Sequence, residues 1–132
     1  MVYAEMTKRA ARQLAAGNHV VWDAATNTRA QRDHLARLAQ QCNSIAVGVW
    51  VESPLDLAKK RAGTARTDGL AGQVTRVIPA HIFDQYVAAF ETPSSSESII
   101  RVAGTVSFAL QWRRIKRQLH PIMPRKLPRL VQ

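Results

Sequence analysis

Apolar residues recur at helical spacing at the start of the chain. Val2, Met6 and Ala10 are each four residues apart, in a stretch without proline or glycine. Gly17 follows where a residue in the left-handed conformation would end a helix. This pattern predicts a helix over residues 2–16.

Three further helices are predicted from caps and apolar stripes. Residues 28–41 carry an apolar stripe behind the cap candidates of residues 26–28 (Thr-Asn-Thr). Ser53 and Pro54 supply an N-cap and a first helical position for a helix that ends in residues 59–61 (Lys-Lys-Arg). Pro79 starts another helix, whose apolar positions continue to Phe90. Between these last two, glycines and arginines in residues 62–78 indicate a mobile basic loop.

Three apolar runs have the length and composition of strands. Residues 19–22 form a short run that stops at Asp23, as a buried parallel strand with a polar residue at its carboxyl end would. Residues 45–51 are uninterrupted apolar positions with β-branched content, which is typical of a central strand covered on both faces. Residues 99–110 read as the last strand, and Gly104 marks a point at which it could divide.

The alternation of these helices and strands predicts the fold class. Helices and strands that follow one another in turn form parallel α/β sheets with right-handed crossovers. We therefore expect an α/β, three-layer parallel sheet with helices on both faces. Only three strands are predicted and the first element is a helix, so this sheet is expected to be incomplete at its N-terminal side.

Acidic and basic residues are distributed differently before and after residue 110. The 132 residues have a net charge of +10 from 19 basic and 9 acidic residues. Residues 1–110 contain 12 of the basic residues and every acidic one, whereas residues 111–132 contain seven basic residues and no acid. We therefore predict a body at 1–110 and a basic, proline-containing tail at 111–132, with a short helix over residues 112–119.

Composition excludes several classes of protein. No apolar run approaches the roughly 18 residues of a membrane-spanning helix, and the first residues are too charged for a signal peptide. A single cysteine, Cys42, excludes an internal disulfide framework and fits a reducing compartment. The four histidines have no metal-ligand spacing. These features predict a soluble, cytoplasmic protein without a membrane partner.

Three segments carry chemically informative residues in a fixed order. The first, residues 19–27, ends in Asp-Ala-Ala-Thr-Asn and is followed by Arg32. The second runs from the strand and proline of residues 49–54 to Arg61 and Arg66. The third begins with Arg-Val-Ile-Pro at residues 76–79 and ends in Phe-Glu-Thr-Pro at residues 90–93.

These segments together resemble the P-loop kinase family that contains polynucleotide kinases and zeta-toxin-like small-molecule kinases. The resemblance spans roughly residues 2–102. The chain departs from the family pattern by one extra alanine in the first segment and by one extra residue in the spacing of the second. The Phe-Glu-Thr-Pro ending is the most specific of the matches.

The resemblance implies a role for each basic or acidic residue in these segments. Asp23 would hold Mg²⁺ through water, as a carboxylate at the carboxyl end of a strand can. Arg61 and Arg66 would lie on a closing lid and neutralise charge on the transferred phosphoryl group. Arg32 and Arg76 would bind substrate phosphate. From the residues alone, a turn or cap residue is the better explanation of Asp23, and a solvated helix end explains Arg61 and Arg66 as well as the lid does.

The phosphate-binding loop of this family is missing from the sequence. No GxxxxGK[ST] motif occurs, because none of the six glycines is followed by Lys-Ser or Lys-Thr. In the family this loop, the first strand and the general base precede the helix that starts here. We therefore expect a truncated kinase-like core that binds ATP poorly by itself. A start site placed too late, a decayed fragment and a split enzyme with a P-loop-bearing partner are the three explanations.

Two functions remain open at this stage. The resemblance implies ATP-dependent phosphoryl transfer, with Mg²⁺, to a hydroxyl of a nucleic-acid end or a small molecule. The alternative is a non-catalytic nucleic-acid-binding or assembly module that uses the basic tail. The incomplete sheet also predicts an exposed strand edge and, through it, self-association or a partner.

Overall fold

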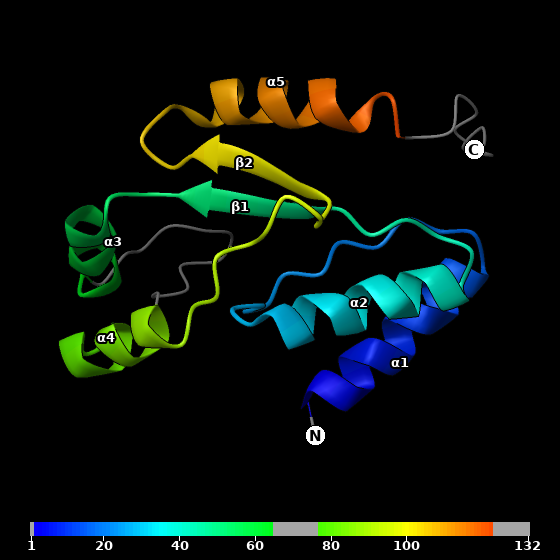
Figure 1. The fold of residues 1–132 in the computed structure, drawn as a ribbon, viewed down its shortest axis with the longest axis horizontal. Coiled ribbons are helices and arrows are strands. Elements are labelled where there is room, and N and C mark those ends of the chain that lie inside the picture. Colours follow the sequence, from blue (N-terminus) through cyan, green and yellow to red (C-terminus); the bar gives the residue numbers. More distant parts are fainter. Residues whose placement is uncertain (1, 65–76, 123–132) are drawn as a thin grey trace, which may run out of the picture.

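The computed structural model describes residues 2–64 and 77–122, which form a mixed α/β fold (Figure 1). The elements, in chain order, are α1 (Val2–Ala15), α2 (Arg29–Gln41), β1 (Gly48–Glu52), α3 (Leu55–Ala62), α4 (Ala80–Ala88), β2 (Ile99–Ala103) and α5 (Phe108–Leu119). No helix within these ranges is long and apolar enough to cross a membrane.

The predicted helices of the N-terminal half are confirmed. Gly17 adopts φ +79° directly after α1, and its N–H donates to Leu14 O, as expected for a left-handed helix end. Thr28 caps α2: its hydroxyl accepts from the backbone N–H of Gln31, whose side chain accepts from the backbone N–H of Thr28. This reciprocal capping box fixes the start of α2.

The starts of α3 and α4 follow proline. Pro54 and Pro79 are the capping residues, and neither helix has a side-chain cap. The prediction of Ser53 as the N-cap of α3 is therefore wrong by one residue. Of the predicted mobile loop, residues 65–76 lie outside the described residues.

The described part of the sheet contains two parallel strands in place of the three predicted. β1 pairs with β2 in the register Val49↔Ile100 and Val51↔Val102. Residues 19–22 were expected as a strand, but they form none, and Val21 is 94% exposed. A strand requires a neighbour to satisfy its backbone groups, and no described strand lies beside this segment.

The last predicted strand is wrong beyond Ala103. The chain turns over residues 104–107, and a helix, α5, begins at Phe108. The short helix predicted over residues 112–119 is part of α5. The central strand also begins later than predicted, at Gly48, because Ile45 lies outside the pairing and is 70% exposed.

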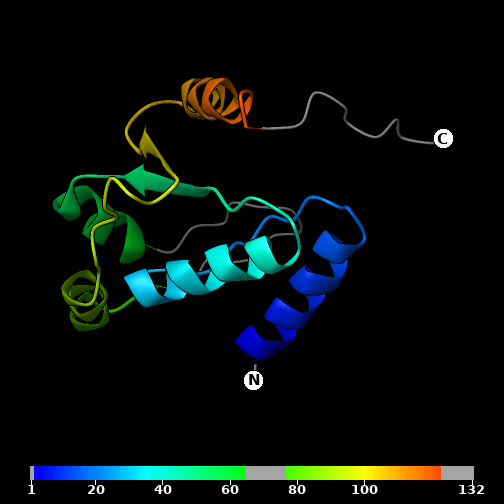
Figure 2. The ribbon, with the colours of Figure 1, turned by 45° about the vertical axis from the view of Figure 1, so that its right-hand side comes forward.

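The helices pack in three groups (Figures 1 and 2). α1 packs with α2, α3 with α4, and α5 with β2. Ile100 and Val102, which are 3% and 2% exposed, form the buried centre of the sheet. By the pairing register, Val49 and Val51 of β1 lie on the same face of the sheet as Ile100 and Val102. Their side chains are 47% and 53% exposed, so the part of the protein that covers this face of β2 does not cover β1. An α/β fold is thus present, and its arrangement in three layers stays a prediction.

Candidate functional site

Arg61 lies at the carboxyl ends of both strands. It stands near the end of α3, the helix that follows β1, and its Nη1 donates to Gly104 O at 3.0 Å. Gly104 follows β2 directly, and its own N–H donates to Glu52 O, the last residue of β1, at 2.6 Å. In open parallel sheets, ligands bind at this end of the strands. Of the predicted catalytic residues, Arg61 is thus placed where a phosphate group could approach.

Gly104 is required for this close approach. A Cβ at this position would collide with Ser53 Oγ and lie 3.1 Å from the backbone oxygen of Glu52. Any side chain would therefore push the turn after β2 away from the end of β1. This displacement would also move the carbonyl oxygen of Gly104, which accepts the hydrogen bond from Arg61.

An ion pair between helices holds α3 in position. Lys59 Nζ on α3 lies 2.7 and 2.8 Å from the two carboxylate oxygens of Asp84 on α4. Both side chains are substantially exposed, so the pair orients the helices more than it stabilises the fold. Arg61 lies two residues beyond Lys59, and the pair therefore contributes to the position of its guanidinium group.

Arg101 links the two strands near the carboxyl end of β1. Arg101 of β2 donates from Nε and Nη2 to the carboxylate of Glu52, at 2.9 and 2.5 Å, and its guanidinium lies 4.7 Å from the ring centroid of Trp50. These hydrogen bonds lower the pKa of Glu52 and raise that of Arg101, and the charge of Arg114 lowers the pKa of Glu52 further. The ring of Trp50 also packs against Phe90 at 5.4 Å. Arg101 thus cross-links the strands.

The first and third motif segments meet in the structure. The backbone N–H of Glu91 donates to Asn27 O at 2.9 Å, and the carboxylate of Glu91 accepts from the backbone N–H of Arg29 at 2.6 Å. The second of these bonds places a negative charge at the N-terminus of α2, where the helix dipole stabilises it. We call residues 26–32 and 90–97 the motif junction.

Arg32 lies at the centre of the motif junction. Its Nε donates to Glu97 Oε2 at 2.6 Å, and its Nη1 donates to the carbonyl oxygens of Thr26 and Asn27 at 3.2 Å each. The side chain is 11% exposed. This arrangement differs from the expected phosphate-binding role, because the donors are directed at the protein's own oxygens. In this structure Arg32 holds two loops together.

Asp23 lies directly before a bend at Ala24 and is exposed. The segment before it is not a strand, so the geometry on which its Mg²⁺ role depended is absent. Within residues 2–64 and 77–122, no group of three or more His, Cys, Asp or Glu side chains could hold a metal ion. These residues do not by themselves fit a magnesium site, and without a Gly-Lys-Ser/Thr loop they do not fit a triphosphate either. Arg66 and Arg76 lie outside the described residues.

Several residues of this region escaped the sequence analysis. Glu97, Glu52, Lys59 and Arg101 were given no function. The sequence does contain a signal for Arg101. It lies between Ile100 and Val102, which are buried, and successive side chains of a strand point to opposite faces, so Arg101 had to face the other side of the sheet. The pairing of Lys59 with Asp84 has no comparable signal, because it depends on how two helices pack.

Comparison with known proteins gives one family. The family described as AAA domain matches residues 1–93, which include α1 to α4, β1 and most of the motif junction. No curated protein and no solved structure gives a significant match. β2 and α5 lie beyond the matched residues. Because the match covers more than half of its length, the chain belongs to the AAA domain family, a P-loop NTPase-type family.

Proposed function

We propose that this chain is part of an ATP-dependent kinase, in which Arg61 stabilises the phosphoryl group during its transfer to a hydroxyl of a nucleic-acid end or a small molecule. The single observation that carries this proposal is the position of Arg61 at the carboxyl ends of β1 and β2, held by Gly104 O at 3.0 Å. Membership of the AAA domain family supports it. A guanidinium group matches phosphate oxygens in a planar, bidentate manner and keeps its charge at all relevant pH values.

The proposal requires a phosphate-binding loop from outside these 132 residues. The free edge of β1 is the place at which such a segment would join. Among the described strands β1 pairs only with β2, so its other edge offers backbone groups to a further strand. Val49 and Val51 are half exposed on the adjoining face and would be covered by the residues that accompany that strand. The segment comes either from residues that precede this chain or from a partner polypeptide.

The test uses the gene product purified from its natural source. Its intact mass is compared with the 14.7 kDa of this chain, and its ATP consumption is measured with and without single-stranded oligonucleotides bearing a 5′-hydroxyl. We expect a heavier protein, or co-purification of a second polypeptide, together with ATP consumption. A 14.7 kDa protein without a companion and without activity would overturn the proposal.

Matched variants of that active protein test the role of Arg61. Replacing one charge-stabilising donor in phosphoryl or acyl transfer typically lowers kcat by about 10²-fold or more, and we expect this for Arg61→Ala. Arg37→Ala removes the same charge from an exposed position of α2 and should leave kcat unchanged. Equal kcat values for Arg61→Ala and the unaltered protein would remove Arg61 from the mechanism. Asp23→Asn and the corresponding variants of Arg66 and Arg76 extend the test to the other predicted residues.

The alternative function, a non-catalytic nucleic-acid-binding or assembly module, is favoured by a separate observation. The basic residues of α5 are exposed and lie after residue 93, outside the family match. They could act whether or not the chain takes part in catalysis.

A further inference from the structure

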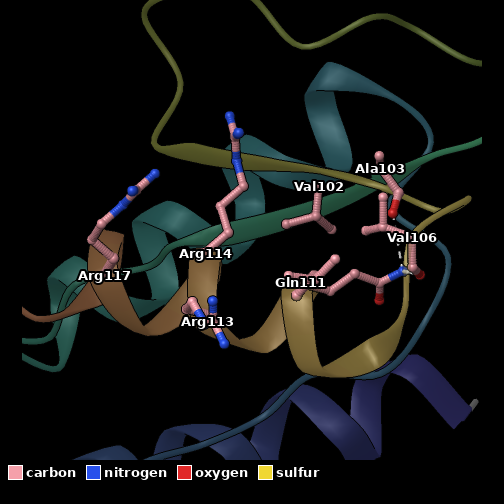
Figure 3. Close-up of a pocket in the computed structure, with 8 residues that line it drawn as sticks. Val102, Ala103, Val106, Gln111, Arg113, Arg114 and Arg117 are labelled. Carbon is pink, nitrogen blue, oxygen red and sulfur yellow. Dashed lines mark hydrogen bonds between the residues drawn. The ribbon is translucent and has the colours of Figure 1, made fainter.

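We propose that a groove between α5 and the end of β2 binds the phosphate backbone of single-stranded nucleic acid. The groove has a volume of about 290 Å³, and three arginines of α5 line it: Arg113, Arg114 and Arg117 (Figure 3). This binding function goes beyond phosphoryl transfer and does not depend on it.

The residues that line the groove include no carboxylate, although Glu52 of β1 lies near enough for the charge of Arg114 to lower its pKa. No Asp or Glu follows Glu97 anywhere in the sequence, and α5 carries Lys116 beside its three arginines. Within residues 2–64 and 77–122, no carboxylate lies within 4.0 Å of a guanidinium nitrogen of Arg113, Arg114 or Arg117. All three side chains are exposed. Their donors are therefore available to an external anion.

The groove is built on a fixed frame. Gln111, in the first turn of α5, donates from Nε2 to Ala103 O at 3.0 Å and to Val106 O at 3.1 Å. These bonds tie the start of α5 to the end of β2 and to the turn between them (Figure 3). Val102 lies at the base of the groove and is 2% exposed. The arginines thus project from a helix that is fixed to the buried part of the sheet.

The spacing of the arginines suits a run of phosphates. Arg114 and Arg117 are three residues apart and Arg113 and Arg117 are four apart, so they follow one side of the helix. Figure 3 shows Arg114 and Arg117 extending in the same direction from α5. Cations placed in a row favour a polyanion over a single anion, because each phosphate contact releases condensed counterions.

An exposed aromatic ring on α5, outside the residues that line the groove, favours single-stranded nucleic acid. Trp112 is 45% exposed, and Lys116 Nζ lies 5.6 Å from its ring centroid. Exposed aromatic rings in basic surroundings stack on unpaired bases of any sequence. The free bases of a single strand, unlike those of a duplex, are accessible to such a ring.

The packing of α5 disfavours an anionic membrane as the partner. Gln111, Ile115 and Leu119 are half buried and lie on one stripe of the helix, and α5 contacts β2. A helix that binds a bilayer surface must insert its apolar stripe among the lipids. Here Ile115 and Leu119 of that stripe are already half buried within the protein, although Phe108, Leu110 and Trp112 of the same helix stay 75%, 49% and 45% exposed.

The test is the binding of a fluorescein-labelled 20-nucleotide oligo(dT) to the full chain, followed by fluorescence anisotropy at several salt concentrations. We expect affinity to fall steeply with salt. The variant Arg113→Gln/Arg114→Gln/Arg117→Gln should bind about ten-fold more weakly or worse, and its log–log salt slope should be smaller by about 2, since each contact to a single strand contributes about 0.7. Circular dichroism checks that the variant keeps its helices.

A variant with the same loss of charge elsewhere is the control. Lys8→Gln/Arg9→Gln/Arg12→Gln removes three exposed cations from α1, and residues 123–132 stay unaltered in both variants. We expect this control to bind nearly as tightly as the unaltered chain. Equal losses in the two variants, or no loss in the α5 variant, would overturn the proposal.

Two further measurements test whether bases stack on Trp112 and whether the groove binds lipid headgroups. Trp112→Ala should weaken oligo(dT) binding while Trp112→Phe retains most of it, and equal affinities for both would contradict a stacking role. Vesicles of phosphatidylcholine and phosphatidylserine should not compete with oligo(dT) at equal phosphate concentration. Binding of the vesicles, with no binding of oligo(dT), would assign the groove to lipid headgroups and overturn the proposal.

Discussion

The carboxylate of Glu97 lies 2.6 Å from Nε of Arg32, a residue 65 positions earlier in the chain. Their side chains are 8% and 11% exposed, so water screens this pair far less than the other ion pairs among the described residues. The hydrogen bond from Arg32 is the main cause that lowers the pKa of Glu97, from 4.5 to about 2, and the backbone N–H of Ser94 adds to the effect. Glu97 therefore links two segments that the sequence places far apart.

The stability of the fold should depend on pH through Glu97. A carboxylate whose pKa is lower in the folded than in the unfolded state contributes stability above the unfolded value and loses it as the pH falls through the folded one. We therefore expect the urea concentration at the unfolding midpoint of the unaltered chain to decrease as the pH is lowered from about 4.5 to about 2. Glu97→Gln should have a lower midpoint at pH 7 and a flatter dependence on pH.

An exposed carboxylate provides the control for this measurement. Glu5 pairs with Arg9 on the surface of α1, where both side chains are more than half exposed. Glu5→Gln should keep the pH dependence of the unaltered chain. If Glu97→Gln and Glu5→Gln gave the same curve, the motif junction would not depend on the charge of Glu97.

Arg32 should stabilise the fold through the motif junction. The loss of stability on replacing Arg32 should therefore be coupled to the loss on replacing Glu97. Arg32→Gln leaves the Glu97 carboxylate without its main partner and two loop carbonyls without a donor. In a double-mutant cycle followed by urea unfolding, Arg32→Gln/Glu97→Gln should lose less stability than the two single variants added together. Arg37→Gln, on the exposed side of α2, should unfold like the unaltered chain. Strict additivity would indicate that the two residues stabilise the fold separately.

Gly104 should tolerate no side chain. We expect Gly104→Ala to lower the free energy of unfolding by about 1–3 kcal/mol, because the added methyl group overlaps Ser53 and approaches the backbone of Glu52. Gly63→Ala is the matched control: Gly63 has φ −83°, and a Cβ there would meet its nearest neighbour at an ordinary 3.4 Å. Chemical denaturation of both variants compares them, and an equal loss would contradict the close approach at Gly104.

Local signals predicted most of the helices. The start of α2 was foreseen because Thr28 caps it through its own neighbours, and Gly17 ends α1 through its own backbone conformation. Such features depend on residues within one turn of each other. The position of Arg61 near the end of α3 was foreseen for the same reason.

The failures come from contacts between distant segments. Residues 19–22 have a strand-like composition, but strands exist only in pairs, and β1 pairs with β2 alone among the described strands. Residues 104–110 continue an apolar pattern, yet Gly104 meets the end of β1 and the chain turns there. The partner of Arg32 depended on the docking of two loops, which no spacing along the sequence encodes.

Ile100 should be among the residues on which the fold depends most. It is 3% exposed at the centre of β2, and one of only four buried apolar residues in the described part of the chain. Removal of a buried isoleucine side chain to Cβ costs about 2–5 kcal/mol, since the cavity left behind is only partly filled. We expect Ile100→Ala to lower the free energy of unfolding by this amount, whereas Val21→Ala, at a position 94% exposed, should change it little. Urea unfolding followed by circular dichroism compares the two. A loss for Val21→Ala as large as that for Ile100→Ala would mean that residues 19–22 are buried in solution, as the sequence pattern predicts and this fold does not show.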